Sequence, residues 1–283
     1  MYLRIKKDSV TSILLFIFNV FLVERGINSV PLKKIFRLLE PFQKSETSIR
    51  MGLSRGVQNG LFVNEKPGQE VYYRLTDAAV QSFEYWQKTL ARFQERINLQ
   101  YAGWDGAWSI VLLDLPPRNK PADCIDQFTQ SLEQLGYGSL NKGQWVSPYN
   151  FSADVIRLAD KYVLEKEIFI FQGNLQNKKP EKLASEVWPV EELASKYKKY
   201  YQEIKKPAGN LIAVPNPGQV LTFLYLYGSE LFEIIQDDPQ LPVQLLPADW
   251  LGPKAAQTFG EIRKQVLPEA NGFIDEIVES SRL

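Results

Sequence analysis

Residues 45–62, SETSIRMGLSRGVQNGLF, combine a helical pattern with two glycines, and no other stretch constrains the fold as much. Ser45 is placed to cap a helix, because its hydroxyl can accept the free backbone N–H groups of the first turn. The apolar residues recur every four positions and share one face: Ile49, Leu53 and Val57. Gly52 and Gly56 fall beside that face, although an interior glycine costs about 1 kcal/mol relative to alanine. We therefore expect another segment of backbone to pass very close to this helix.

The other half of this helix is polar and basic. It carries Thr47, Met51, Ser54 and Gln58, flanked by Arg50 and Arg55. Such side chains can contact the phosphates and base edges of DNA. A surface helix with a solvated polar face would show the same pattern, so the neighbouring elements have to decide between the two interpretations.

Two helices are expected before this one and a hairpin after it. The first helix covers 9–25, and the second begins at Pro31, since proline is favoured at a helix start, and ends at Pro41. Two β-rich runs, 61–64 and 71–75, flank the turn EKPGQE. Three helices and a hairpin form a winged helix-turn-helix, whose third helix enters the major groove. In this arrangement the two glycines would let the second helix lie close against the third.

The charges support a polyanion as the partner of the first segment. The 33 basic and 33 acidic residues balance overall, but residues 1–76 carry a net charge of +6 and the remainder a net charge of −6. A basic segment ahead of an acidic body indicates a polyanion partner for that segment only, and together with the winged-helix pattern it leads us to expect double-stranded DNA. Lys44 lies at the positive end of a helix, where a cation is unfavourable. It would serve instead as a phosphate contact.

Composition excludes several classes of site. The chain has no histidine, which excludes Ser-His-Asp and Cys-His catalysis and histidine-ligated metal sites. The single cysteine, Cys124, cannot form an intramolecular disulfide, which fits a reducing cytoplasm. The apolar run at 10–23 is shorter than the roughly 20 residues of a membrane span and lacks a signal-peptide cleavage site. We expect a buried helix there, and neither a membrane partner, a metal nor a resident cofactor.

The middle of the chain alternates strands and helices. A long helix is expected over 77–98, as a linker or a dimer contact, followed by a buried strand over 108–115. The series continues with a helix at 122–135, two short strands around Asn141-Lys142-Gly143, a helix at 153–161 and a strand at 167–173. This β-α-β-β-α-β order is typical of a ferredoxin-like domain.

From residue 181 the pattern becomes helical again. Helices are expected around Pro189, over 219–236, over 254–266 and over 269–280, with a packed, leucine-rich loop before the last two. The fold class expected is therefore α+β. The expected domains are a winged helix-turn-helix at 1–76, a linker helix at 77–100, a ferredoxin-like domain at 101–180 and a helical domain at 181–283.

Several segments together resemble the PaaX-type transcriptional repressors, regulators of phenylacetic acid catabolism. The resemblance covers nearly the whole chain and rests on LLEPFQKSETSIRMGLSRGVQNGLF, YYRLT, WDGAWSIVLLDLP, LGYGSLNKGQWVSP and DPQLPVQLLPADWLG. It implies a dimeric cytoplasmic repressor that binds an operator through its winged helix. It also implies release by an aryl-CoA thioester, phenylacetyl-CoA in the namesake of the family.

The expected DNA-binding residues come from this resemblance and from the helix pattern. The resemblance extends to the recognition helix at Ser45, Ser48, Arg50, Ser54 and Arg55. Charge and polarity add Lys44, Thr47, Gln58 and, in the wing, Lys66. Glu65 and Glu70 lie beside Lys66, which weakens the expectation that the wing binds phosphate strongly.

An aryl-CoA effector needs an aromatic pocket and cations for its phosphates. The candidate residues are Trp104, Trp108, Tyr137, Trp145 and Tyr149, with Arg118 and Lys120 for the phosphates. Aromatic residues bury large areas and most often form core, so this set has two interpretations. No glycine-rich phosphate loop of the Walker or Rossmann kind is present in the sequence.

Two other function classes remain open. The middle domain resembles the small Cas2 nucleases, and a nucleic-acid-processing enzyme of that kind would use Asp114 at the end of the first strand. A single aspartate that closes a strand is more often a turn or cap residue, and a fold does not carry a function. A winged-helix scaffold that binds protein would not require the +6 charge of the first segment. We expect a ligand-responsive repressor without enzymatic activity.

Overall fold

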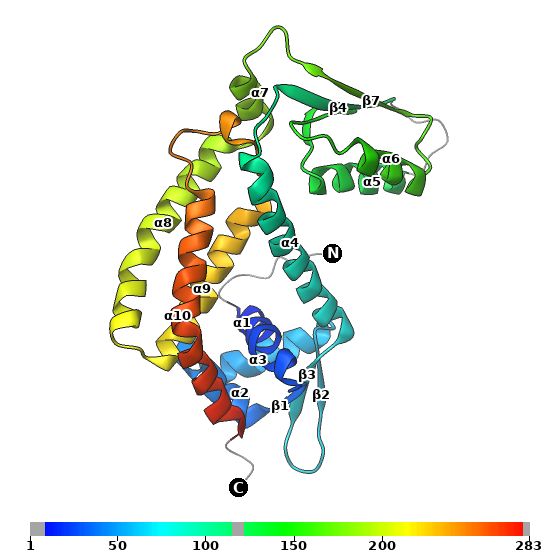
Figure 1. Ribbon diagram of the computed structural model, residues 1–283. Coiled ribbons are helices and arrows are strands. Elements are labelled where there is room, and N and C mark those ends of the chain that lie inside the picture. Colours follow the sequence, from blue (N-terminus) through cyan, green and yellow to red (C-terminus); the bar gives the residue numbers. More distant parts are fainter. Residues whose placement is uncertain (1–8, 115–121, 280–283) are drawn as a thin grey trace. The chain divides into compact units, whose positions relative to one another are not determined.

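The structure is a computed structural model that describes residues 9–114 and 122–279 (Figure 1). Contacts within the chain divide it into two compact units. The first unit consists of the residues up to Arg92, Tyr197–Gln236 and the residues from Leu251 onward, and the second consists of Phe93–Lys196 and Asp237–Trp250. Each unit is therefore built from segments that lie far apart in the sequence.

The first unit begins with a helical run that buries the most apolar stretch of the chain. The Ser9 side chain caps α1 (Val10–Ile17), which continues through a π-helical segment (Phe18–Leu22) and a 3-10 turn (Val23–Arg25). Gly26, with a φ of 69°, ends the run. Among the described helices, none is long and apolar enough to cross a membrane.

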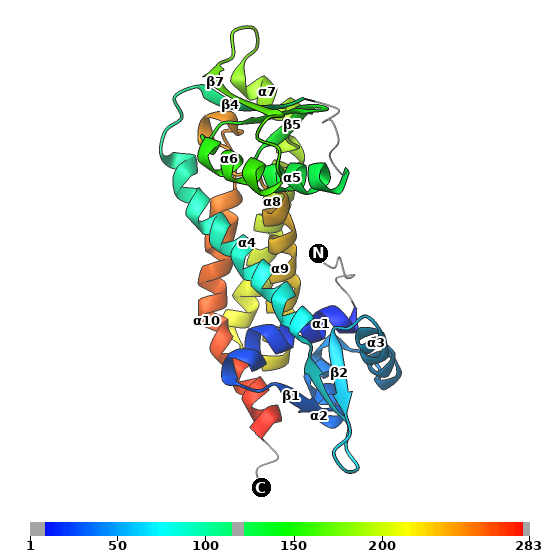
Figure 2. The same cartoon turned by 90° about the vertical axis from the view of Figure 1, so that its right-hand side faces the viewer.

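Two further helices and a β-hairpin follow. α2 (Leu32–Leu39) leads through a 3-10 turn (Glu40–Phe42) to α3 (Glu46–Gln58). The expected hairpin is present as β2 (Phe62–Glu65) and β3 (Tyr72–Leu75), which pair antiparallel. Figure 2 shows this hairpin extending beyond the helices.

A third strand, β1 (Ser29–Pro31), pairs with β3 on the side away from β2, and the sequence pattern does not indicate it. Three residues that end in a proline carry too short a pattern to mark a strand, and the pairing depends on β3, which lies more than forty positions later.

The helix α4 (Asp77–Tyr101) follows the hairpin and is about one turn longer than expected. Residues at 79, 89, 93 and 100 along it are buried, so it packs against other parts of the chain along its length. Within the first unit, Trp86 of α4 lies against Phe232, with ring centroids 5.5 Å apart.

Long helices complete the first unit. They are the later part of α8 (Val190–Ala213), most of α9 (Pro217–Asp237) and α10 (Gly252–Glu279). α9 and α10 run side by side, and Phe259 of α10 packs against Gly228 of α9 (Figures 1 and 2). The expectation of two helices separated at Pro268 is wrong, because α10 continues through this proline. Pro268 is exposed while Val266 and Ala270 beside it are buried, so packing on both sides maintains the helix.

The second unit contains a four-stranded antiparallel sheet. Its elements are β4 (Ala107–Leu113), α5 (Ala122–Gln134), β5 (Gly138–Asn141), β6 (Gln144–Ser147), α6 (Ser152–Lys161) and β7 (Ile168–Asn174). The strand order is β5-β6-β4-β7, the order of a ferredoxin-like sheet. α5 and α6 lie together on one face of this sheet (Figure 1).

The two faces of this sheet have separate cores, because successive side chains of a strand point to opposite faces. Val111 and Leu113 of β4 pack with Phe128 and Leu132 of α5 on the helix-covered face. Trp108 of the same strand belongs to the other core. That core also contains residues of α7 (Pro180–Val187), Trp188, and Leu241 and Leu245 from the loop before α10.

Candidate nucleic-acid interface

The N-terminal end of α3 is built as the sequence predicts. The Ser45 hydroxyl accepts a hydrogen bond from the Ser48 backbone N–H at 3.2 Å, and the two side-chain oxygens lie 2.9 Å apart. This hydrogen bond satisfies one of the free donors of the first turn and fixes where the helix begins. Ser45 therefore has a structural role, whatever else it contacts.

The two faces of α3 differ as expected. Ile49, Leu53 and Gly56 are buried, whereas Val57, which was expected on the same face, is partly exposed. The exposed residues are Ser45, Thr47, Ser48, Arg50, Ser54, Arg55 and Gln58, and Lys44, just before the cap, is partly exposed. The structure thus brings all the helix residues of the predicted DNA-binding set onto one helix, with their side chains accessible.

The glycines of α3 do allow other elements to approach closely, but the expectation that α2 is the approaching element is wrong. A Cβ on Gly52 would lie 2.5 Å from Val10 Cβ of α1, and the Thr11 hydroxyl donates to the Gly52 carbonyl at 3.2 Å. A Cβ on Gly56 would overlap the ring of Phe62 in β2. The first helix and the hairpin, rather than α2, therefore lie against this face. The sequence pattern shows that something approaches, but it contains no information on which element does.

The two arginines of α3 differ in how firmly they are held. Arg50 extends over the ring of Phe36, with its guanidinium carbon 5.1 Å from the ring centroid, and its Nη2 lies 3.9 Å from Glu46. It is still 58% exposed, so both contacts are weak and can give way to a ligand. Arg55 is an exposed residue in the last turn of the helix. Together they place one cation on each side of the polar face.

The hairpin carries cations and carboxylates in nearly equal measure. Lys66 is exposed at its turn. Arg74 of β3 lies 3.1 Å from Glu65 of β2, and the Tyr72 hydroxyl donates to Glu70. Arg74 is not in the set of residues expected to bind DNA, although a basic residue facing outward on a wing strand is a recognisable pattern. The ion pair with Arg74 partly offsets the negative charge of Glu65, one of the two wing carboxylates.

The aromatic residues predicted for an effector are divided between two cores. Trp104 and Trp108 pack edge to face at 5.1 Å, and Trp108 stacks on Trp188 at 6.3 Å. Tyr137 and Trp145 lie in the core on the helix-covered face of the sheet. The structure does not bring these four side chains together around a common space.

The hydroxyls of the two tyrosines in this set already have partners within the chain. The Tyr137 hydroxyl lies 2.7 Å from the Ser109 hydroxyl, and burial raises the pKa of Tyr137. Tyr149 donates to the Gln240 carbonyl at 2.7 Å, and burial raises the pKa of Tyr149 as well. The other two residues of the predicted set, Arg118 and Lys120, lie outside the described residues.

Asp114, the candidate of the enzymatic alternative, follows β4 directly. Its backbone N–H donates to the Glu167 carbonyl at 2.8 Å, and its side chain is exposed. The described residues hold no group of three His, Cys, Asp or Glu side chains placed for a metal ion near it or elsewhere. Its position is that of a residue that closes a strand.

Comparisons with known proteins find matches to one family in three consecutive parts of the chain. Residues 10–79 match the family description "PaaX-like protein", residues 101–184 match "PaaX protein central Cas2-like domain" and residues 188–276 match "PaaX-like protein C-terminal domain". The Transcriptional repressor PaaX of Escherichia coli (strain K12) is 24% identical over 282 residues, covering 96% of this chain and 84% of the relative.

A solved structure has the same fold over nearly all of the chain. It is the uncharacterized protein Rv0674 from Mycobacterium tuberculosis, with a TM-score of 0.52 at 18% identity, covering 94% of this chain and 99% of that one. At this identity the likeness concerns the fold alone. The three consecutive family matches, with the Cas2-like sheet in the middle one, establish that this chain belongs to the PaaX family.

Proposed function

We propose that this protein is a transcriptional repressor that binds double-stranded operator DNA through its first segment. In this proposal α1, α2 and α3 form a winged helix-turn-helix, with α3 in the major groove and the β2-β3 hairpin as the wing. The observation that carries it is the accessible polar face of α3, which presents Arg50, Ser54, Arg55 and Gln58 beside a buried apolar face. The name of the Escherichia coli relative supports the assignment as a repressor.

The regulated pathway and the effector belong to the same proposal. Membership of the PaaX family supports genes for phenylacetate-type aromatic acid catabolism as the targets. The proposed effector is phenylacetyl-CoA or a related aryl-CoA, which would release the protein from its operator. The proposed assembly is a cytoplasmic homodimer, because helix-turn-helix repressors read two half-sites one helical turn apart.

The DNA assignment is tested on the two arginines of α3. Arg50→Ala and Arg55→Ala should each weaken binding to the promoter DNA of the neighbouring genes by about 1–3 kcal/mol and relax sequence preference. Their melting temperatures should stay near the wild-type value, since both side chains are exposed. Arg263→Ala, an exposed arginine of α10, is the matched control and should bind as the wild type does. Unchanged affinity in both α3 variants would contradict the assignment.

The effector is tested by titration at constant salt, because phosphate contacts make DNA affinity salt-dependent. Phenylacetyl-CoA should lower operator affinity, and operator DNA should lower affinity for phenylacetyl-CoA by the same factor. Free phenylacetate and acetyl-CoA, each lacking one half of the ligand, should act much more weakly. If acetyl-CoA acts equally well, the aryl group is not what the protein recognises.

A further inference from the structure

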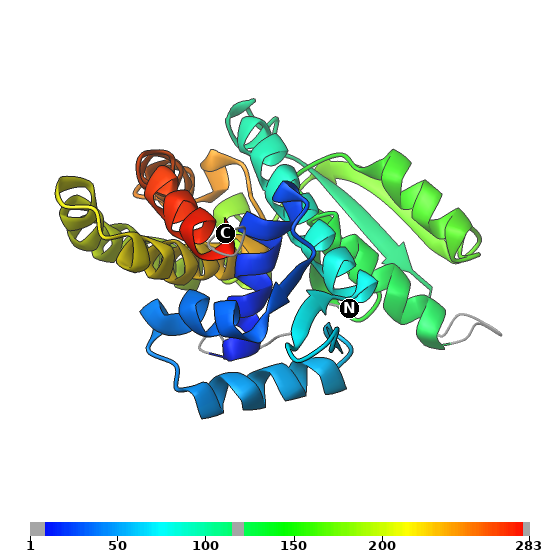
Figure 3. The same cartoon turned by 90° about the horizontal axis from the view of Figure 1, so that it is seen from below.

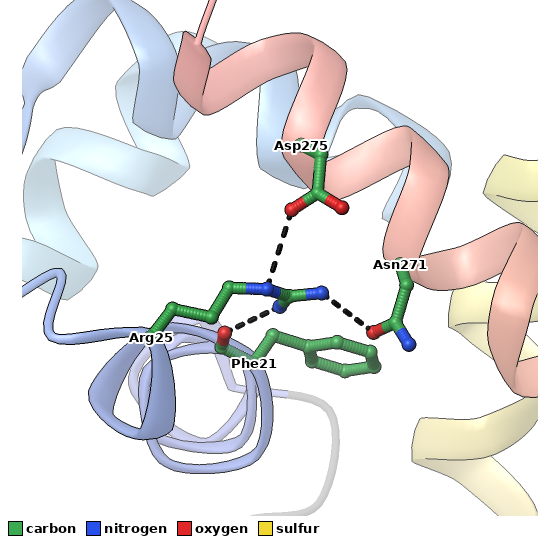
Figure 4. Close-up of polar contacts among 4 residues, drawn as sticks. All are labelled: Phe21, Arg25, Asn271 and Asp275. Carbon is green, nitrogen blue, oxygen red and sulfur yellow. Dashed lines mark hydrogen bonds and ion pairs between the residues drawn. The ribbon is translucent and has the colours of Figure 1, made fainter.

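Cations of the basic first segment contact the C-terminal part of α10, and Arg25 makes the most extensive of these contacts. The Arg25 Nε lies 3.2 Å from the Asp275 carboxylate, and its Nη2 donates to the Asn271 side-chain oxygen at 2.8 Å. Its Nη1 donates to the Phe21 carbonyl. Figure 4 shows the guanidinium held between α10 and the end of the first helical run.

Two cations of α2 extend this contact. The Lys34 ammonium donates to the Val278 carbonyl, and Arg37 Nη2 lies 3.5 Å from Glu276. A helix C-terminus carries partial negative charge, which favours a cation such as Lys34 there. Figure 3 shows the red end of α10 beside the dark blue N-terminal segment.

The spacing of these residues brings several of them to the same side of each helix. Lys34 and Arg37 are three positions apart on α2 and so share one face. Asn271, Asp275 and Val278 are spaced by four and three positions and share one face of α10. We call the residues that meet here the α10 clamp: Arg25, Lys34, Arg37, Asn271, Asp275, Glu276 and Val278, the last through its carbonyl.

Burial identifies the strongest member of the clamp. The Arg25 and Asp275 side chains are 27% and 45% exposed, whereas Arg37 and Glu276 are 49% and 74% exposed. Water screens the outer pair, so it contributes little. Arg25 makes three contacts at once and connects the end of the first helical run to α10, just before Gly26 and β1.

We propose that Arg25 is a positioning residue for DNA recognition, which acts through Asp275 of α10 and does not contact phosphate. The proposal rests on the proposed function. α10 fixes the end of the first helical run and α2, and α2 is joined to α3 by only a 3-10 turn and a few residues. The placement of α3 in the groove therefore depends on the end of α10. Part of the basic charge of the first segment serves this contact rather than the DNA.

The variant Asp275→Asn distinguishes two roles for Arg25, because positioning and direct phosphate contact predict opposite changes in DNA affinity. If Arg25 contacted phosphate, removal of the competing carboxylate would strengthen DNA binding. If it positions the recognition helix, affinity for the operator should fall, by about three- to tenfold. The slope of log affinity against log salt should stay at the wild-type value, because removing a single phosphate interaction would change that slope by about 0.9.

Matched variants complete the experiment. Glu269→Gln removes the same charge from an exposed site on the same helix and should leave affinity unchanged or slightly raised. Asp275→Glu should restore most of the affinity. The double variant Arg25→Gln with Asp275→Asn should lose no more affinity than Arg25→Gln alone, as expected for two residues that act as a unit.

Two outcomes would overturn the proposal while the proposed function stands: wild-type affinity or tighter binding in Asp275→Asn, or a reduced salt slope in Arg25→Gln. Absence of operator binding by the wild-type protein would instead contradict the proposed function itself. Fluorescence anisotropy with one operator fragment at a series of salt concentrations gives all of these quantities.

Discussion

Gly52 and Gly56 lie where two other side chains leave no room for a Cβ. At Gly52 the obstacle is Val10 Cβ, which is attached directly to the backbone of α1 and cannot rotate away. At Gly56 it is the ring of Phe62, which is 1% exposed and fixed in the core. Relief would therefore require the backbone of α1 or of the hairpin to shift.

Alanine at either glycine should destabilise the first unit. We expect Gly52→Ala and Gly56→Ala each to cost about 1–3 kcal/mol by overpacking. Gly260→Ala in α10 is the control: among the described residues nothing lies within 4 Å of its Cβ position, and alanine there should stabilise by about 1 kcal/mol. Urea denaturation followed by circular dichroism measures all three. A stabilised Gly52 variant would mean that α1 does not lie against α3.

Tyr200 is a buried tyrosine whose hydroxyl has no hydrogen-bond partner among the described residues. Tyr200→Phe should therefore keep or slightly raise stability at neutral pH, since it removes a polar group that burial penalises. A loss of more than about 1 kcal/mol in urea titrations would show that the hydroxyl is bonded in solution.

The same residue predicts a loss of stability at alkaline pH. Burial raises the pKa of Tyr200 in the folded protein, while an unfolded tyrosine has a pKa of about 10. Above that pH the unfolded chain releases a proton that the folded chain retains, so stability falls as pH rises. Urea midpoints measured at neutral pH and just above that unfolded pKa should differ less for Tyr200→Phe than for the wild type. An equal difference would assign the alkaline loss to other groups.

At the scale of elements, α10 is the clearest case in which packing overrides a local preference. A proline within a helix removes one backbone hydrogen bond and costs about 3 kcal/mol. Pro268 is exposed, so its replacement removes no buried side chain. Pro268→Ala should raise the melting temperature, with a stabilisation of about 1–3 kcal/mol. A lower melting temperature in a thermal scan would mean that α10 bends at this residue and that the bend is required.

At the scale of the whole molecule, the second unit depends on a segment remote in sequence. Leu241 and Leu245, from the loop before α10, are 0% and 3% exposed in the core that contains Trp108. Together with α7 and Trp188, this loop covers that face of the sheet. The Cas2-like sheet is therefore completed by residues that follow its last strand by more than sixty positions.

Leucine truncation tests this dependence in the full-length chain. Leu241→Ala should destabilise the second unit by about 2–5 kcal/mol, so the red shift of tryptophan fluorescence that accompanies unfolding should occur at lower urea concentrations. Val243→Ala, in the same short loop but 38% exposed, should have little effect. Equal effects of the two changes would contradict the packed position of Leu241.

The local elements follow from the residues within each short segment. Ser9 and Ser45 mark where helices begin, Gly26 and Gly136 take left-handed conformations where helical runs end, and short apolar runs locate the strands of the second unit. These features depend on interactions among residues a few positions apart, so they can be recognised without knowledge of the rest of the chain. The polar face of α3 belongs to the same class, because it follows from helical periodicity alone.

Which elements meet depends on the fold of the whole chain. Val10 rather than α2 lies against Gly52, the strand β1 exists because β3 pairs with it, and Arg25 contacts Asp275 from 250 positions away. The sequence predicts a single aromatic set, yet the sheet separates it, because Trp108 and Trp145 lie on opposite faces. Such contacts depend on the path of the whole chain, and no pattern within a short segment contains them.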